Sequence, residues 1–142
     1  MAQTATLYRF RIDLSDIDRN VYEELDFRIA MHPSEISEFL ITRVIAYALN
    51  IQRGLEFSPG GLSDADAPCI RMLTDNGTLQ LWIEIGNPSA KKLHKAAKAA
   101  REVKVYTYKD ANALLKEMAA EKVHRAEEIS IYSLQPKFLG QL

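Results

Sequence analysis

The amino-acid sequence predicts one α/β domain, residues 1–142, in which helices flank a mixed central sheet and a β-hairpin is added at the N-terminus. Three observations predict this class. The 142 residues are 47% hydrophobic and 26% charged, which suffices for one core. Two pairs of short apolar segments are separated by polar turns. From residue 79 onward, strand and helix patterns alternate, which predicts parallel strands joined by right-handed crossovers.

The first hairpin is predicted from period-two alternation. Residues 7–14 carry apolar side chains at the even positions, residues 15–20 form a polar turn, and residues 21–31 alternate again. Two alternating segments joined by a short turn are expected to pair as antiparallel strands.

A long helix is predicted to follow, because apolar residues recur at three- and four-residue spacing from Ile36 to Ile51. Pro33 fits the first helical position, Glu35 would lie in the first turn, and Gly54 would end the helix. The segment 56–68 contains Gly, Pro and Asp residues and is predicted to be a loop.

The second half of the chain contains the remaining elements. The turn Asp75–Gly77 joins two strands, since Asn and Gly accept the positive φ of a tight hairpin turn. Asn87 is predicted to cap a helix that extends to Arg101. On a helical wheel Lys92 borders the buried face and Lys95 lies further round. That buried face consists of Leu93, Ala96, Ala97 and Ala100. A strand over 103–108, a helix capped by Asp110 and a strand over 129–134 follow, and residues 135–142 are left unassigned.

The charge, the cysteine count and the distribution of apolar residues exclude several classes of function. There are 18 Lys and Arg residues against 19 Asp and Glu, so the overall charge of −1 does not indicate a nucleic-acid or membrane partner. Cys69 is the only cysteine, which excludes a disulfide within the chain and a cysteine-based zinc site. We expect Cys69 to be a small buried residue, because a nucleophile would need a histidine nearby. Without a signal peptide or an apolar run of membrane-spanning length, the sequence predicts a cytoplasmic protein.

Three acidic residues occupy unusual positions. Glu84 shares one face of its strand with Trp82, where an ionised carboxylate costs roughly several kcal/mol unless a basic side chain or a metal ion accompanies it. Glu35 lies near a helix start and Asp66 lies just before the second hairpin. Each also has a plain structural explanation: an ion pair for Glu84, a helix-dipole preference for Glu35, and a loop position for Asp66.

Four segments resemble the YaeQ family of bacterial proteins: "HPSE" (32–35), "GGLSDADAP" (60–68), "LWIEIG" (81–86) and "NPSAKKLHKAAKAA" (87–100). The resemblance covers nearly the whole chain. The family is similar in fold to the PD-(D/E)XK nuclease superfamily, whose core is helix–three strands–helix–strand. YaeQ proteins continue with further strands beyond the segment that matches 129–134, so we expect those strands to be dispensable or this chain to be a shortened version.

The resemblance implies a divalent-metal site. In the nuclease superfamily a helix Glu, an Asp before or on the second core strand, and an acidic-x-Lys triplet on the third strand surround the ion. Matched residue by residue, these acids are Glu35, Asp66 and Glu84. Asp75 is the alternative to Asp66 as the second metal ligand, but its position in a tight hairpin turn already explains Asp75.

The catalytic lysine departs from the superfamily pattern, since the triplet ends at Gly86 instead of lysine. In the superfamily this lysine can come from the next helix. Lys95 matches the lysine of the YaeQ pattern, and Lys91 and Lys92 are reserves.

The resemblance therefore implies Mg²⁺- or Mn²⁺-dependent phosphodiester hydrolysis on a nucleic acid. Oxygen ligands without Cys or His favour these hard cations. Such an ion polarises a phosphoryl oxygen while a lysine stabilises developing charge. A local basic surface on the helix and its end can meet phosphates. This surface comprises Lys91, Lys92, Lys95, Lys98 and Arg101.

Two alternatives stay open. A nuclease-fold protein without activity could bind nucleic acid or a protein partner, and the glycine at position 86 favours this alternative. A protein partner could also dock on the N-terminal hairpin. Retention of all three acids favours the enzyme.

Overall fold

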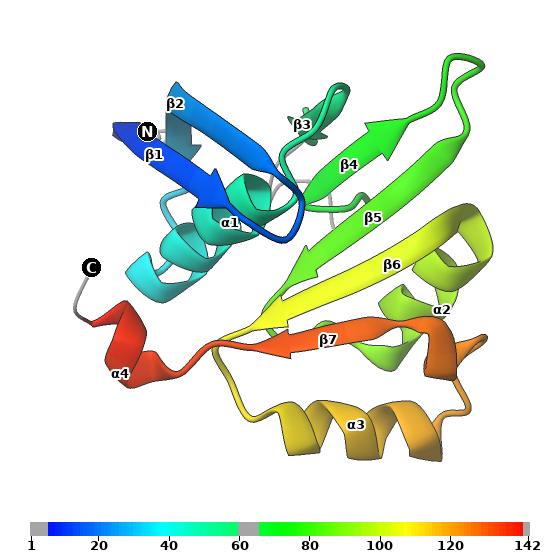
Figure 1. Ribbon diagram of the computed structural model, residues 1–142. Coiled ribbons are helices and arrows are strands. Elements are labelled where there is room, and N and C mark those ends of the chain that lie inside the picture. The colour runs from blue at the N-terminus through cyan, green and yellow to red at the C-terminus, as the bar shows by residue number, and fades with distance from the viewer. Residues whose placement is uncertain (1–5, 60–65, 141–142) are drawn as a thin grey trace, which may run out of the picture.

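The structure is a computed structural model that describes residues 6–59 and 66–140 (Figure 1). Its strands are β1 (Thr6–Asp16), β2 (Val21–Met31), β3 (Leu55–Phe57), β4 (Ile70–Leu73), β5 (Leu79–Ile85), β6 (Ala100–Thr107) and β7 (Ser130–Ser133). Its helices are α1 (Ser37–Leu49), α2 (Ala90–Ala99), α3 (Ala111–Ala120) and α4 (Pro136–Leu139), with a 3₁₀ turn at Ala126–Glu128. A mixed sheet with flanking helices and an N-terminal hairpin confirms the predicted class.

The N-terminal hairpin is formed by β1 and β2, with Phe10 opposite Phe27 in the antiparallel register. Its inward face lies against α1 (Figure 1), where Ile29 of β2 packs in one cluster with Leu40 and Val44 of the helix. The alternation of apolar and polar side chains is what forces this face inward.

The five-stranded sheet has the order β3-β4-β5-β6-β7. β3, β4 and β5 are antiparallel neighbours, whereas β5, β6 and β7 are parallel, as the alternation of strands and helices predicts. The turn between β4 and β5 has Gly77 at φ +82°, the left-handed conformation that favours glycine. In the strand order given above, β5 is the middle strand of the sheet.

Helices cover both faces of this sheet (Figure 1). Trp82 points to the face under α2 and α3, where it joins a cluster that includes Leu93 and Leu114. The neighbouring side chains Leu81 and Ile83 point to the opposite face, in a cluster that includes Ala46 of α1. The predicted small-residue face of α2 is confirmed, since Ala96 and Ala97 are buried against the sheet and allow close approach. In the described ranges no helix is long and apolar enough to cross a membrane.

Two predicted boundaries of α1 are wrong. The helix begins at Ser37, so Glu35 precedes it instead of lying in its first turn. The reason is a separate tight turn, in which the Glu35 N–H donates to the His32 carbonyl oxygen at 2.8 Å. At the other end the helix stops at Leu49, and Gly54 belongs to the turn that precedes β3.

The prediction of a loop over 56–68 is wrong at its start, where strand β3 forms. Leu55 pairs with Met72 and Phe57 pairs with Ile70, and the pairing adds to the burial of the Leu55 and Phe57 side chains. A strand of three residues is too short to show a period of two in the sequence. Residues 60–65 of the predicted loop lie outside the described residues.

The start and end of α2 also differ from the prediction. Ser89 caps the helix, because its hydroxyl accepts from the Lys92 N–H at 3.1 Å. Asn87 instead accepts from the Thr107 hydroxyl at 2.6 Å and so joins the ends of two neighbouring strands. Arg101 is not in the helix but in β6, since Ala100 is already extended.

Candidate active site around Glu84

Glu84 lies in the middle strand of the five-stranded sheet, not at its edge, and is only 2% exposed. Its Oε1 accepts from the indole Nε1 of Trp82 at 2.8 Å. Its Oε2 is 3.2 Å from the Nζ of Lys92. The partner that the sequence requires for this buried carboxylate is therefore a lysine from the following helix.

The strand–turn–helix connection positions Lys92 over Glu84. Gly86 leaves the sheet with φ +81°, and its N–H donates to the Tyr106 carbonyl oxygen at 2.8 Å. Ser89 then caps α2, so Lys92 lies in its first turn with a side chain that is 22% exposed. The left-handed conformation also explains the glycine at position 86, because a lysine there would be strained.

Burial governs the protonation of this site. It raises the pKa of Glu84, and the positive charge of Lys92 and the hydrogen bond from Trp82 oppose that rise. The Cys69 thiol lies 3.9 Å from Glu84 Oε2. Burial, and then the negative charge of Glu84, raise the pKa of Cys69 to about 12. Cys69 is thus the small buried residue that the sequence predicts.

A pocket of about 250 Å³ opens beside this cluster. Glu84 and Lys92 contribute to one wall, and Tyr108 and Lys109, which follow β6, contribute to another. The pocket thus combines a buried carboxylate with two cationic side chains at the end of a parallel strand pair, a position where ligands commonly bind in α/β folds.

Glu35 lies on the α1 side of this region and is buried. One carboxylate oxygen, Oε1, accepts from the Arg43 guanidinium at 2.9 Å and from the His32 backbone N–H at 3.0 Å. The other oxygen, Oε2, has no hydrogen-bond partner among the described residues. Burial, and then the charges of Glu38 and Glu35, raise the pKa of Tyr108, which connects Glu35 electrostatically to the pocket wall.

Asp66 is exposed in the turn that precedes β4. Its Oδ1 is 3.4 Å from the Nζ of Lys95. The lysine that matches the YaeQ pattern is therefore next to Asp66, whereas Lys92 is next to Glu84. Asp75, the rival aspartate, lies in the hairpin turn between β4 and β5.

Each predicted metal ligand thus has a cationic neighbour: Arg43 for Glu35, Lys95 for Asp66 and Lys92 for Glu84. In residues 6–59 and 66–140 no three His, Cys, Asp or Glu side chains converge as an ion-binding group. The role of Arg43 was not predicted from the sequence. The signal that could have indicated it is the position of a charged residue on the apolar face of α1.

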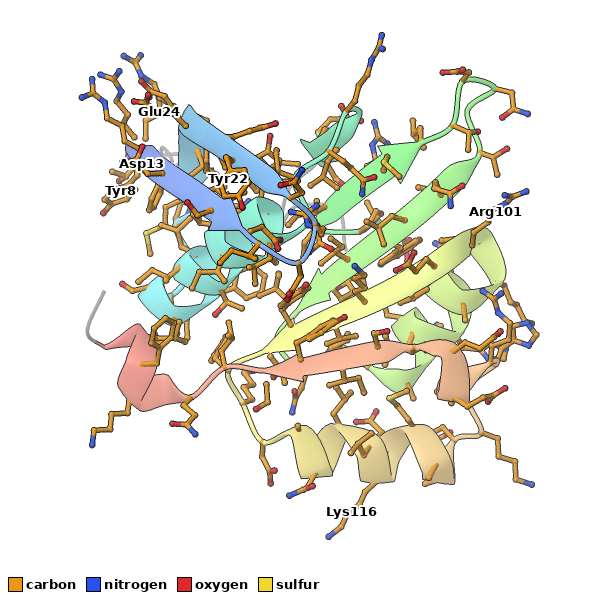
Figure 2. All side chains as sticks on the ribbon, viewed as in Figure 1. Tyr8, Asp13, Tyr22, Glu24, Arg101 and Lys116 are labelled. Atoms are coloured by element: carbon orange, nitrogen blue, oxygen red, sulfur yellow. The ribbon has the colours of Figure 1, made fainter. Side chains whose placement is uncertain are left out.

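Most of the predicted basic surface is present on one side of α2. Lys91, Lys95 and Lys98 are exposed, and Lys92 is half-buried. Arg101 is exposed at the start of β6 (Figure 2).

Comparison with known proteins places the chain in a family. The profile described as YaeQ protein matches residues 1–142. The protein named "Uncharacterized protein YaeQ" of Escherichia coli strain K12 is 34% identical over 108 residues, which are 76% of this chain and 59% of that protein. The protein of the same name from Salmonella typhi is 33% identical over the same shares. The chain thus matches less than two thirds of the length of these curated relatives.

Solved structures agree with the sequence match. The crystal structure of YaeQ protein from Pseudomonas syringae superposes with a TM-score of 0.89 at 30% identity, covering 99% of this chain and 78% of that one. The structure of YaeQ protein from Xanthomonas axonopodis pv. citri gives a TM-score of 0.85 at 33% identity, covering 98% and 80%. The profile match over residues 1–142, the relatives and the shared fold agree, and the chain belongs to the YaeQ family.

Proposed function

We propose that the protein is a metal-dependent phosphodiesterase of nucleic acid and that its active site is the pocket beside Glu84. One observation carries the proposal: a carboxylate only 2% exposed, in the middle strand of a sheet, faces a lysine amine at the wall of an open pocket. Stability alone does not favour a charge there, because a well-packed apolar side chain is often as stable or more so. A buried ionisable group with a specific charge partner beside a cleft indicates a functional site.

The proposed metal ligands are Glu35, Asp66 and Glu84. Their donor set consists of carboxylate oxygens, which suits Mg²⁺ or Mn²⁺. The Oε2 atom of Glu35 has no hydrogen-bond partner among the described residues and so keeps its lone pairs available. When bound, the ion would polarise a phosphoryl oxygen and lower the pKa of its bound water. The three carboxylates must loosen their present ion pairs to converge.

Lys92 is the better placed of the two candidate lysines. It lies 3.2 Å from Glu84 and contributes to the pocket, so its charge can face a phosphoryl oxygen that enters there. Lys95 lies 3.4 Å from Asp66 on the exposed side of α2. We assign Lys92 the stabilisation of developing negative charge, and Lys95 the positioning of Asp66.

The proposed substrate is a nucleic acid because exposed cations extend from the pocket along α2. Several of them can contact consecutive phosphates, which would make binding weaken steeply with salt. These side chains are Lys91, Lys95, Lys98 and Arg101.

A second candidate function is binding of nucleic acid without hydrolysis. Two observations favour it: glycine occupies position 86, and all three acids already have a basic neighbour. In this case Lys92 neutralises Glu84 permanently, and only the basic side of α2 meets the phosphates.

Calorimetric titration of chelator-stripped protein with Mn²⁺ tests the first proposal, with Glu84→Gln as the paired variant. Binding at one site that the variant lacks is the expected result. Asp75→Asn serves as the matched control, since the turn residue should leave binding unchanged. No heat at millimolar metal would remove the phosphodiesterase proposal.

Assays with labelled single- and double-stranded DNA and RNA then separate the two candidate functions. Metal-dependent cleavage that Glu84→Gln and Lys92→Met abolish supports the enzyme. Salt-sensitive binding without cleavage, weakened by Lys98→Glu, supports the second candidate. Absence of both contradicts any role in nucleic-acid chemistry.

A further inference from the structure

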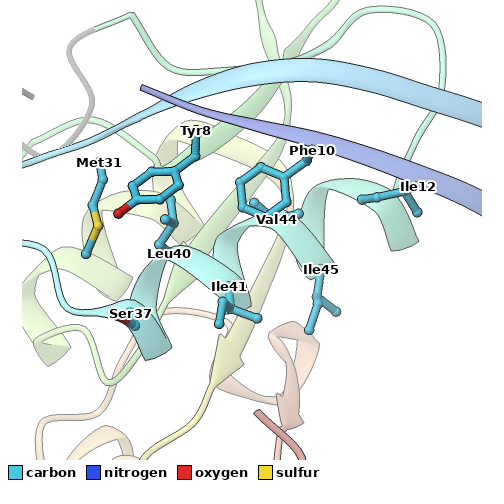
Figure 3. A pocket seen from close by; sticks show the side chains of 9 residues that line it. All are labelled: Tyr8, Phe10, Ile12, Met31, Ser37, Leu40, Ile41, Val44 and Ile45. Carbon is cyan, nitrogen blue, oxygen red and sulfur yellow. The ribbon is translucent and has the colours of Figure 1, made fainter. Parts of the chain in front are cut away.

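The pockets away from Glu84 differ in the chemistry of their walls. A pocket of about 520 Å³ between the N-terminal hairpin and α1 is lined mainly by apolar side chains, Phe10 and Ile45 among them (Figure 3). A smaller pocket of about 270 Å³ lies where α2 ends and β6 begins, and several of its side chains are charged. Charged walls select a ligand by its chemistry, so the smaller pocket can be assigned a class of ligand.

This smaller pocket, called the α2-end pocket below, lies at the opposite end of β5 from Glu84. Thr78 and Leu79 line it at the start of β5, and Ala100 and Arg101 line it at the start of β6, where Leu79 pairs with Ala100. At the rise of a strand, Leu79 and Glu84 are roughly 16 Å apart. The pocket is also at the end of the sheet away from α4, the last described helix, which packs against α1 (Figure 1).

The α2-end pocket is lined by basic side chains without an acidic side chain among its described lining residues. These basic side chains are Lys98, Arg101, His124 and Arg125. Lys98 and Arg101 are exposed and form no ion pair with any residue in the described ranges. On the same helix, by contrast, Lys92 and Lys95 each lie beside a carboxylate. The positive charge of the α2-end pocket is therefore not balanced within the described part of the chain.

Arg125 is held in place by the backbone at the end of α2. Its Nη2 donates to the carbonyl oxygens of Ala97 and Ala100 at 2.7 Å and 2.9 Å. Its Nε is 3.4 Å from the carboxylate of Glu128. Its Nη1 makes no hydrogen bond with a described residue, so one arm of the guanidinium keeps its donors available. The bonds to the two carbonyl groups also offset the negative end of the helix, which would otherwise repel an anion.

The connection that carries His124 and Arg125 is fixed on α2 by His94. The Nδ1 atom of His94 accepts from the backbone N–H of His124 at 3.0 Å, and the two rings stand edge to face with their centroids 6.0 Å apart. Arg125 has φ +51°, a left-handed conformation that residues other than glycine adopt rarely. Such a conformation persists where the surrounding contacts impose it, and it is frequent at ligand sites.

We propose that the α2-end pocket binds a phosphoryl group, as inorganic phosphate or as the end of a phosphate monoester. A phosphate monoester brings three acceptor oxygens and a charge of about −2 at neutral pH, which suits one lysine and two arginines better than a single carboxylate does. An arginine fork and a lysine amine are the usual donors to phosphate.

The pocket volume limits what can enter. It is below the range of about 300–1,000 Å³ that holds a whole drug-sized ligand, so only the phosphoryl end of a larger molecule would fit. The proposal does not rest on the phosphodiesterase proposal, because it requires neither Glu84 nor a metal ion.

A titration of the isotope-labelled full chain with inorganic phosphate tests the proposal, at constant ionic strength and with a chelator present. Backbone amide shifts in nuclear magnetic resonance spectra should change at residues 98–102 and 123–126 and saturate at millimolar phosphate. Arg101→Met should raise the dissociation constant by about tenfold or more, since a charge-assisted contact is lost. Lys91→Met and Lys116→Met remove exposed charges outside the pocket and should leave binding unchanged (Figure 2).

A dinucleotide with a terminal phosphate, and the same dinucleotide with a terminal hydroxyl, identify the source of the phosphoryl group. If the phosphorylated dinucleotide binds at the same amides more tightly than inorganic phosphate, the ligand is the end of a nucleic-acid strand. If it binds no more tightly, the ligand is free phosphate. Equally tight binding of the hydroxyl form would overturn the assignment to a phosphate monoester.

The other outcomes are equally distinct. No localised shift at millimolar phosphate, shifts centred on Glu84 and Lys92 instead, or equal weakening by Lys91→Met and Arg101→Met would each overturn the proposal. Glu84→Gln should bind phosphate as the unmodified chain does. The Mn²⁺ titration described above reports on the Glu84 pocket alone, so failure of one proposal can be told from failure of the other.

Discussion

Lys92 of α2 and Glu84 of β5 form an ion pair of 3.2 Å in which the carboxylate is almost fully removed from solvent and the lysine side chain remains 22% exposed. The indole of Trp82 binds the other carboxylate oxygen. This asymmetry means that the two partners should respond differently to substitution, because only the carboxylate depends on the pair for its solvation.

Glu84→Gln should leave the free energy of unfolding at neutral pH unchanged or raise it by up to about 2 kcal/mol. The amide keeps an oxygen for Trp82 and removes the cost of burying a charge. Urea denaturation measures the change. A clear loss of stability would mean that the Lys92 pair contributes more than burial costs.

The advantage of Glu84→Gln should depend on pH. The pKa of Glu84 is raised by burial in the folded state, so its contribution to stability is fully present below the ordinary glutamate pKa of about 4.3 and is lost as pH rises through the folded value. The variant and the parent should therefore converge in stability at acidic pH and diverge toward neutral pH. Parallel stability curves at all pH values would contradict the raised pKa.

Lys92→Met should destabilise the fold by about 2–4 kcal/mol, because it leaves a buried carboxylate without its counter-charge. Lys95→Met is the matched control on the same helix. Its pair with Asp66 is exposed at both side chains, so the expected change is below about 1 kcal/mol. Equal effects of the two substitutions would show that the buried pair has no special weight.

Arg43→Met should cost about 3–5 kcal/mol, measured by the same denaturation. It removes the guanidinium from the buried Glu35 and also from the Ala30 carbonyl oxygen. Arg53→Met, an exposed arginine after the same helix, should have little effect. If Arg43→Met were equally mild, the ion pair between Arg43 and Glu35 would contribute little to the stability of the fold.

The Cys69 thiol should react with alkylating reagents far more slowly in the folded protein than in denaturant at neutral pH. Its pKa of about 12 leaves almost no thiolate, and its side chain is buried. Mass spectrometry after timed alkylation follows the reaction. In Glu84→Gln the rate should stay low, since burial is the main cause of the raised pKa. Fast labelling in the native state would contradict this burial.

Short-range patterns predict most of the fold because each element has a clear period. The even positions of 8–14 and the alternation in 79–86 define strand faces, and Asp110 caps α3 as expected, its carboxylate accepting from the Asn112 N–H at 2.9 Å. β3 could not be predicted, since three residues show no period and its pairing with β4 depends on distant contacts.

The candidate site was predictable only in part. The helical wheel places Lys92 at the border of the buried face, and its side chain is half-buried in the structure. Its 3.2 Å ion pair with Glu84 was not predicted from the sequence. The predicted start of α1 was wrong because the His32–Glu35 turn contains the same residue types as a helix N-terminus. No sequence pattern pairs Glu35 with Arg43, since that contact depends on how the segment before α1 folds back on the helix.

The left-handed turn at Gly86 and the cap at Ser89 have a consequence for how this site can vary. A single short connection joins Glu84 to Lys92. The number of residues in it determines the direction in which the Lys92 side chain leaves the helix. Inserting one residue within α2 ahead of Lys92 would rotate the lysine by about 100° and carry it away from the carboxylate. The number of residues between the helix cap and the lysine, as much as residue identity, therefore determines whether the buried acid is neutralised or open to another cation.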